Sequence, residues 1–238
     1  GDEALLEHTM RFDKYPLRSE EDWRIAPEAC EHAFNALEPK LREALELAAE
    51  RIRAYHQDQL PRDRDFTDDA GVRLGARWRA VDAAGLYVPG GRASYPSSLL
   101  RNAIPAKVAG VERLAVVTPP PKGELNPLVL AAAHLAGIEE IWRIGGAQAI
   151  GALAYGTERI RAVDVIVGPG NAFVAEAKRQ LYGVVGIDMV AGPSEILVIA
   201  DGKNDPDWIA ADLLSQAEHD PHAQSILITD DALFAEQV

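Results

Sequence analysis

The sequence predicts an α/β protein built on a parallel sheet, and two observations carry that prediction. From about residue 74, short apolar runs alternate with stretches of helical periodicity, and glycine-bearing turns stand between them. Strands that alternate with helices of this length are typical of right-handed βαβ crossovers, which place ligands at the carboxyl ends of the strands. The predicted strands are 114–117, 141–144, 163–167, 196–199 and 225–228, and the predicted helices are 97–109, 126–137, 147–155, 171–182 and 206–218.

Residues 1 to about 60 are predicted to be helical. Apolar residues recur at steps of three and four from Ala29 to Tyr55, so one stripe of this segment should face a core. The rest of the chain is expected to form two α/β domains. Residues 87–195 would be an inserted domain that carries nucleotide-binding turns, and residues 1–86 with 196–238 would be an incomplete first domain that includes the helical start.

Composition argues against several classes of protein. The formal net charge is −13 and the basic residues are scattered, so neither nucleic acid nor a membrane surface is an expected partner. No apolar run approaches the roughly 20 residues that a membrane helix needs, and the start lacks the pattern of a signal peptide. The single cysteine, Cys30, cannot form an internal disulfide, which favours a cytoplasmic location.

The two ends of the sequence indicate a piece of a longer chain. Gly1 stands where an initiator methionine would, and the chain opens directly in a helical pattern. It closes at Asp231–Ala235 with a helix barely begun after a strand. Natural domain boundaries normally fall in polar linkers. Residues are therefore expected to be missing at both ends.

Three glycine-bearing turns, at 85–91, 145–149 and 168–172, predict a nucleotide site. Glycine lets the backbone approach a ligand closely, and a helix that follows offers free amides to an anionic group such as pyrophosphate. None of the turns matches G-x-G-x-x-G, and each alone is more often an ordinary turn. Three at the strand ends of one sheet favour a nucleotide. The side chains that could add stacking and hydrogen bonds there are Tyr87, Gln148 and Asn171.

The segment around Gln216 and His219 is a second candidate site. Asp205 as an N-cap predicts a helix that ends near Glu218, and Gln216 and His219 lie one turn apart, so both can face one small ligand or metal. From residue types alone, zinc would prefer His219 with His222, or Glu218 with His219. A histidine at a helix C-terminus can equally be a solvated residue that the helix dipole favours.

Other reactive side chains are interpreted as structural. Cys30 has no nearby histidine or asparagine in a catalytic pattern and is interpreted as a buried small hydrophobe. Ser194 lacks a G-x-S-x-G elbow, which argues against a serine hydrolase and suits its hydroxyl to holding a polar substrate. The prolines at 119–121 could form a stiff surface loop or line a cleft. The histidines interpreted as structural are His8, His32, His56 and His134.

From about residue 71 onward the sequence resembles the histidinol dehydrogenase family, whose characteristic segments occur here in family order and spacing. The helical start resembles the family more weakly. The segments that carry the resemblance are 85–91, 145–150, 168–178, 187–195 and 213–219.

The resemblance implies two Rossmann-like domains of three-layer α/β/α form, similar to those of aldehyde dehydrogenases, with a helical N-terminal region. Members of the family oxidise L-histidinol through L-histidinaldehyde to L-histidine, in the last steps of histidine biosynthesis. They use NAD and zinc and form homodimers. Two alternatives stay open, namely a related dehydrogenase that acts on another amino or sulfonated polyol, and a nucleotide-binding fragment without catalysis.

The family pattern also assigns roles to residues of this sequence. Its acid/base pair is expected beyond Val238, so no catalytic residue is assigned in this chain. The chain alone is therefore expected to be inactive, and the full-length protein active. The implied zinc ligands are Gln216 and His219, the implied substrate-binding residues are Ser194, Gln216 and His219, and the implied NAD-binding residues are Tyr87, Gln148 and Asn171.

Overall fold

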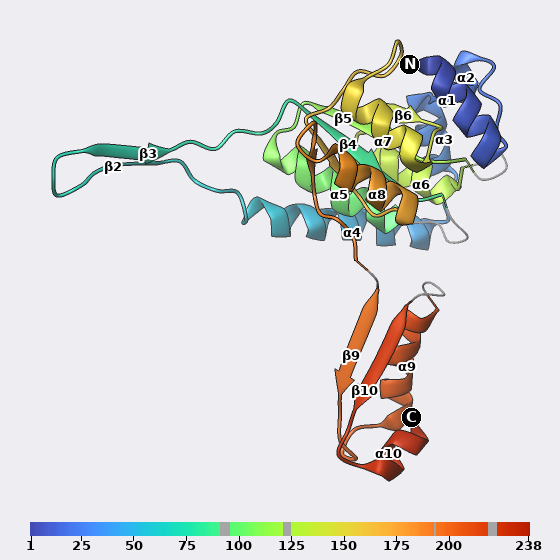
Figure 1. Ribbon diagram of the computed structural model, residues 1–238, viewed down its shortest axis with the longest axis vertical. Helices are drawn as coiled ribbons and strands as arrows, with labels where there is room; N and C mark the ends of the chain where they lie inside the picture. The colour runs from blue at the N-terminus through green and yellow to red at the C-terminus, as the bar shows by residue number, and fades with distance from the viewer. Residues whose placement is uncertain (91–95, 121–124, 193, 219–222) are drawn as a thin grey trace. The chain divides into compact units, whose positions relative to one another are not determined.

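The computed structural model describes residues 1–90, 96–120, 125–192, 194–218 and 223–238 (Figure 1). The chain divides into two compact units, Gly1–Val190 and Ala191–Val238, which are described separately below.

A six-stranded sheet in the order β1-β6-β5-β4-β7-β8 forms the centre of the first unit. All neighbouring strands run parallel except β1, which pairs antiparallel with β6. The predicted parallel sheet is thus confirmed. The strands are β1 (Arg24–Ile25), β4 (Ala83–Tyr87), β5 (Arg113–Val117), β6 (Glu140–Trp142), β7 (Val165–Val167) and β8 (Gly186–Ile187).

Helices cover both faces of this sheet and make three layers (Figure 1). Alternate residues of the central strands enter two separate cores: Leu86 and Val116 pack with α3, α4, α5 and α6, whereas Tyr87 and Val117 pack with α1, α7 and α8. The helices are α1 (Asp2–His8), α2 (Glu20–Trp23), α3 (Pro27–Asn35), α4 (Pro39–Gln57), α5 (Pro96–Ala109), α6 (Pro127–Leu135), α7 (Gly146–Tyr155) and α8 (Ala172–Leu181), with a π-helix, η1, at Thr9–Asp13.

The helical start is interrupted and packs onto the sheet. The predicted apolar stripe is divided between α3 and α4, because α3 ends at Asn35 and Pro39 begins the next helix. Cys30 on α3 is only 1% exposed, and burial raises the pKa of its thiol to about 11, so it is a buried hydrophobe as expected. Among the described residues, no helix is both long and apolar enough to span a membrane.

The sequence analysis missed three strands of this sheet, β1, β4 and β8, of which β4 is the central one. The segment that begins at Gly85 was expected to be a turn, but Gly85 lies in the middle of β4, at the centre of the sheet. A Cβ atom at this position would lie 2.8 Å from Leu153 Cδ1 and 3.2 Å from Val163 Cγ2. Leu153 of α7 fills the space that a side chain would take, which explains a glycine inside a buried strand.

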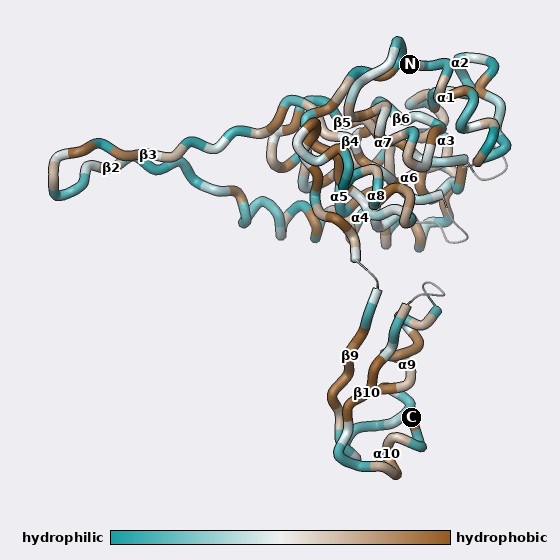
Figure 2. Tube along the Cα trace, in the orientation of Figure 1, coloured by the Kyte–Doolittle hydropathy of each residue, from teal (hydrophilic) through white to brown (hydrophobic). Residues whose placement is uncertain are grey.

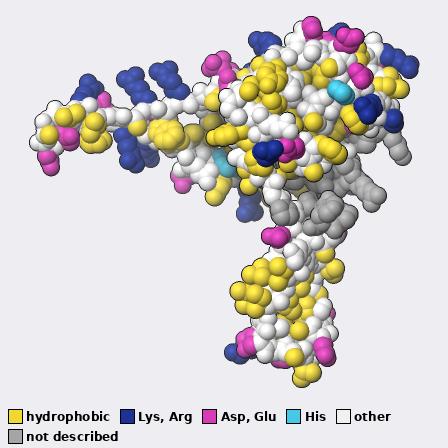
Figure 3. Space-filling model, viewed as in Figure 1, with side chains coloured by type: hydrophobic (Ala, Val, Ile, Leu, Met, Phe, Trp, Pro, Cys, Tyr) yellow, Lys and Arg dark blue, Asp and Glu magenta, His cyan; other side chains and the backbone are white. Residues whose placement is uncertain are grey.

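The hairpin of β2 (Arg64–Thr67) and β3 (Arg73–Ala76) extends away from the sheet of the first unit (Figure 1). Every residue of both strands is exposed. Its turn is made by Asp68, whose Oδ1 accepts hydrogen bonds from Ala70 N at 2.9 Å and Val72 N at 2.8 Å. Basic side chains line the hairpin (Figure 3), and in sequence they are Arg62, Arg64, Arg73, Arg77 and Arg79.

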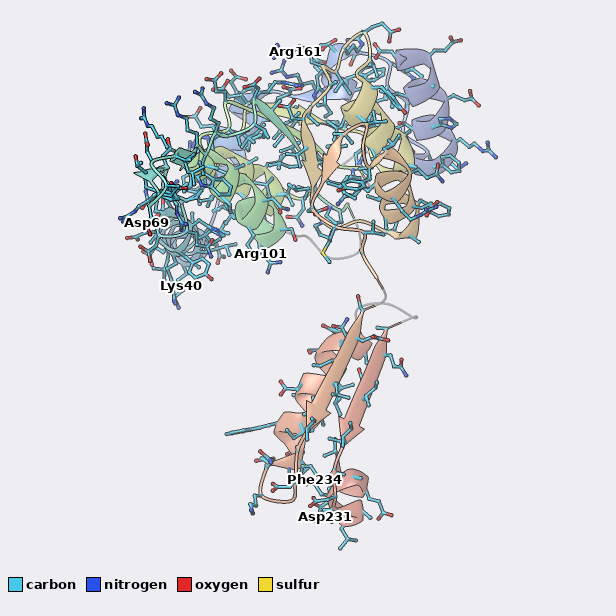
Figure 4. All side chains as sticks on the ribbon, turned by 60° about the vertical axis from the view of Figure 1, so that its left-hand side comes forward. Lys40, Asp69, Arg101, Arg161, Asp231 and Phe234 are labelled. Atoms are coloured by element: carbon cyan, nitrogen blue, oxygen red, sulfur yellow. The ribbon has the colours of Figure 1, made fainter. Side chains whose placement is uncertain are left out.

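The second unit is a small α/β element. The parallel strands β9 (Glu195–Ile199) and β10 (Gln224–Ile228) pack beside α9 (Pro206–Ala217) and α10 (Ala232–Gln237). Both strands were predicted. Its core contains Phe234, and Asp231 caps the helix that carries it by accepting bonds from Leu233 N and Phe234 N (Figure 4). Apolar residues continue along both strands (Figure 2), but Leu197 is 53% and Ile199 75% exposed.

The expected boundary at residue 87 falls on the last residue of β4, and residues on both sides of it belong to one compact unit, because β1 pairs with β6 and α3 packs on α6. That residues 1–86 and 196–238 form one domain of the whole protein stays a prediction.

Because burial differs so strongly between the units, we expect hydrogen exchange to differ as well. Amides of β4 and β5, whose side chains are buried on both faces, should exchange only by large-scale opening. Amides of β9 and β10 should exchange faster, because their small core leaves much of the strands exposed. Exchange mass spectrometry of the 238-residue chain tests this, and slower exchange in β9 and β10 would contradict it.

Candidate functional site

The sheet of the first unit has a topological switch point beside β4. Strands β5 and β6 lie on one side of β4, and β7 and β8 lie on the other. The chain leaves β4 and β5 through α5 and α6 on one face, and leaves β6 and β7 through α7 and α8 on the other. The connections after β4 and β7 therefore diverge. Open parallel sheets bind ligands in the crevice that such a divergence creates at the carboxyl ends of the strands.

Tyr87 ends β4 at this point and is only 3% exposed. Its hydroxyl oxygen accepts a hydrogen bond from Gly146 N, the first residue of α7, at 3.0 Å. Burial raises the pKa of the Tyr87 phenol above its usual value, and the bond from Gly146 offsets part of the rise. The ring is thus a neutral side chain that ties the end of β4 to the start of α7.

Gln148 lies in the first turn of α7 and is half-buried. Its Nε2 donates a hydrogen bond to Asp13 Oδ2 at 3.4 Å, and its Oε1 lies over Gly146, where a Cβ atom would be only 2.6 Å away. Asp13 is the last residue of the π-helix, and burial raises the pKa of its carboxyl group. The N-terminal segment therefore reaches the same edge of the sheet.

The turn after β7 approaches β4 closely. Gly168 has a φ of +112°, and a Cβ atom there would lie 2.2 Å from Tyr87 O, so only glycine fits. Asn171 follows as the N-cap of α8, and its Oδ1 accepts bonds from Phe173 N and Val174 N at 3.1 Å each. Both bonds use the oxygen of the exposed carboxamide, which leaves its Nδ2 group as a donor for another partner.

Pro119 lies in the turn after β5 and packs against the turns that follow β4 and β6. A Cβ atom at Gly90 would lie 2.0 Å from Pro119 O, and one at Gly145 would lie 2.3 Å from Pro119 Cβ. Pro119 is half-buried and Pro120 is buried, so this part of the proline run packs between the turns instead of forming an exposed loop, while Pro121 lies outside the described residues.

The structure thus brings the predicted nucleotide-contacting residues Tyr87, Gln148 and Asn171 to one edge of one sheet. Sequence analysis missed Asp13, which lies 135 residues from its partner Gln148. A contact between residues so far apart leaves no local pattern in the sequence, so only the structure shows the bond between Asp13 and Gln148.

A polar cleft lies at the opposite edge, where the strands begin. Arg113 and Glu140 pair there at 2.8 Å, and Trp142 Nε1 donates to Glu140 Oε1 at 2.8 Å. Burial raises the pKa of the Glu140 carboxyl group, but the bonds from Arg113 and Trp142 outweigh it and hold the pKa below its usual value. Because these charges satisfy one another, we interpret the cleft as structural.

In the second unit, Ser194 and Gln216 lie at the same end. Ser194 precedes β9, and its carbonyl oxygen accepts a bond from Gln224 N at the start of β10 at 3.0 Å. Helix α9 runs back from the other end of β9, and Ser225 Oγ donates to Leu213 O in its last turns at 2.8 Å. Gln216 is half-buried on that last turn. Two of the three predicted substrate-contacting residues thus lie at one end of this unit, and the third, His219, lies outside the described residues.

Of the predicted zinc ligands, only Gln216 lies among the described residues. His219 and His222 lie outside them, and Glu218 is exposed at the end of α9. No group of three His, Cys, Asp or Glu side chains within the described ranges could hold a metal ion. The residues described here do not by themselves fit a zinc ion.

A family model described as histidinol dehydrogenase matches residues 1–238. The chain is 66% identical over 238 residues to the histidinol dehydrogenase of Rhodospirillum rubrum and 65% identical over 238 residues to that of Ruegeria pomeroyi. Each comparison covers 100% of this chain and 55% of the relative. The chain therefore spans about half the length of the curated relatives that it matches.

Solved structures agree with these matches. The chain is similar to the crystal structure of histidinol dehydrogenase from Elizabethkingia anophelis, with a TM-score of 0.91 and 40% identity, over 99% of this chain and 54% of that one. A propionaldehyde dehydrogenase from Clostridium phytofermentans matches with a TM-score of 0.50 and 17% identity, over 99% of this chain and 57% of that one, which is a likeness of fold alone. The predicted α/β class is confirmed.

Replacing Tyr87 by Phe should destabilise the first unit. The change removes the acceptor of the Gly146 N–H bond and keeps the buried ring, so we expect a loss of about 1 kcal/mol in the free energy of unfolding. Tyr155→Phe on the same helix as Gly146 is the matched control, because Tyr155 is 66% exposed. Urea unfolding of both variants checks this, and equal midpoints would contradict it.

Proposed function

Because this chain belongs to the histidinol dehydrogenase family, we propose that the whole protein oxidises L-histidinol to L-histidine through L-histidinaldehyde, with NAD as oxidant and zinc in the site. The reaction would belong to the last steps of histidine biosynthesis, in the cytoplasm. The observation that best supports the proposal is the switch point of the sheet. Tyr87, Gln148 and Asn171 lie there at the carboxyl ends of the strands.

This edge fits a dinucleotide for two physical reasons. Gly168 and Gly90 make backbone contacts that a side chain would prevent, so the turns at this edge pack closely and hold their backbone groups in fixed positions for a ligand. Helix α7 has Gly145 as its N-cap, which has no side chain to cap it, so amides of its first turn other than that of Gly146, which donates to the Tyr87 hydroxyl, can face a pyrophosphate. Asn171 would add its carboxamide Nδ2 as a further donor. When bound there, NAD supplies the hydride acceptor.

Substrate would be held by residues of the second unit. Ser194 offers a hydroxyl, and Gln216 together with His219 would be zinc ligands on and after the last turn of α9. By the resemblance to the family, the remaining ligands and the acid/base pair would come from parts of the whole protein outside this chain. Each proton transfer by such a positioned group is typically worth about 10²–10⁴-fold in rate.

We also place the whole protein in a homodimer. Exposed apolar residues support this, because on the hairpin Phe66 is 54% and Leu74 44% exposed, and such residues favour cover by protein. The part of the whole protein outside these 238 residues is a second source of such cover.

The activity is tested on the full-length protein with L-histidinol and NAD, by following NADH formation and L-histidine as product. Two NADH per L-histidine is the expected yield, because oxidation of an alcohol to an acid removes four electrons. A protein that oxidises another amino or sulfonated polyol and leaves L-histidinol unchanged would overturn the proposal.

The NAD assignment is tested by Asn171→Ala. The variant loses a helix cap and the proposed donor, so the apparent constant for NAD should rise more than the constant for L-histidinol. Asn126→Ala is the matched control, because Asn126 caps α6 by accepting a bond from Leu128 N, and α6 packs on the other face of the sheet from α8. A larger rise for L-histidinol, or an equal rise for NAD in both variants, would remove Asn171 from the site.

A further inference from the structure

We propose that Lys178 and Asp188 are positioning residues that fix the turn from Gly168 to Asn171 in the shape that NAD binding requires. The inference rests on the proposed function, because it concerns the same nucleotide edge. Neither residue is among the predicted NAD-binding residues, and neither needs to touch the nucleotide to act.

The two side chains hold both polar backbone groups of Gly168. Lys178 Nζ donates a hydrogen bond to Gly168 O at 3.0 Å, and Asp188 Oδ2 accepts one from Gly168 N at 2.9 Å. Lys178 and Asp188 also form an ion pair with each other. Gly168 is therefore held from two sides, by Lys178 of α8 and by Asp188, which follows β8. We call these two side chains the clamp.

Burial makes this pair unusual. Lys178 is only 4% exposed and occupies the buried stripe of α8 one turn after Val174. A buried ion pair is weak evidence for stability, since apolar residues of similar size often stabilise a protein as well or better. The pair instead fixes the orientation of the backbone at Gly168, because charge-assisted hydrogen bonds end on both its N–H and its C=O group, which belong to two successive peptide units.

Gly168 has little conformational freedom in this turn. Gly168 has a φ of +112°, and its α-carbon approaches the Tyr87 carbonyl so closely that a Cβ atom would lie 2.2 Å from it. Asn171 caps the same helix that carries Lys178 two turns later. The clamp therefore sets the position of Asn171 relative to Tyr87, and these are two of the three proposed NAD contacts.

Asp188 connects the clamp to a further segment. Its Oδ1 accepts a hydrogen bond from Met189 N at 2.7 Å, so the chain that follows β8 is fixed to the same carboxylate. The carboxylate is 33% exposed, whereas the lysine side chain is 5% exposed. Water can therefore solvate Asp188 if Lys178 is replaced, which makes Lys178 the better residue to change.

The test uses the full-length protein with Lys178→Met, which keeps a long side chain in the core but removes the donor. The NAD dissociation constant, measured by calorimetry, and the NAD KM should both rise roughly tenfold or more, as expected for the loss of a charge-assisted hydrogen bond. The KM for L-histidinol should change much less. Lys203→Met is the matched control, because the Lys203 side chain is 91% exposed, and it should change neither constant.

A double variant, Lys178→Met with Asp188→Asn, separates positioning from stability. It leaves no unpaired charge in the clamp, so its unfolding midpoint should lie near that of the unchanged protein, while its NAD dissociation constant stays raised. NAD binding equal to that of the unchanged protein, in either folded variant, would overturn the inference. If the unchanged full-length protein itself failed to bind NAD, the proposed function would fail instead, and the two failures are thus distinguishable.

Discussion

Burial of β4 on both faces is the constraint on which the first unit depends. Leu86 and Tyr87 are neighbours in sequence but belong to different cores, so helices must cover both sides of the sheet. Parallel strands buried in this way require crossovers, and the crossovers must leave on opposite faces for both cores to be filled. The switch point beside β4 follows from this packing. The candidate site is thus a consequence of how the core is closed.

At that edge, backbone contacts define the shape more than side chains do. Gly168 rests on the carbonyl of Tyr87, and Gly90 and Gly145 rest on Pro119. Side chains then hold the backbone in place, as Tyr87 does for Gly146 and as Lys178 does for Gly168. A site made this way presents amides at fixed positions, which suits a ligand recognised through its phosphates.

The sequence predicted the elements that have strong local signals. The apolar run at 114–117 became β5, and Asp205 did cap the helix that carries Gln216. It missed β4, because Ala83, Ala84 and Gly85 lack the branched side chains typical of strands, and because only the structure shows that Leu153 fills the space of a side chain at Gly85. The glycine turns could be found by pattern. Their partners could not, because contacts such as Asp13 with Gln148 join distant segments.

Pro119 contacts two glycines, Gly90 and Gly145, which affects how the sequence at this edge can change during evolution. Side chains introduced at Gly90 or at Gly145 would both have to displace the same proline residue. Effects of substitutions that share a partner are not additive, since a shift of the shared residue that accommodates one also alters the cost of the other. A substitution in the turn after β4 therefore alters the cost of a substitution in the turn after β6, so these turns are expected to change in a coupled way.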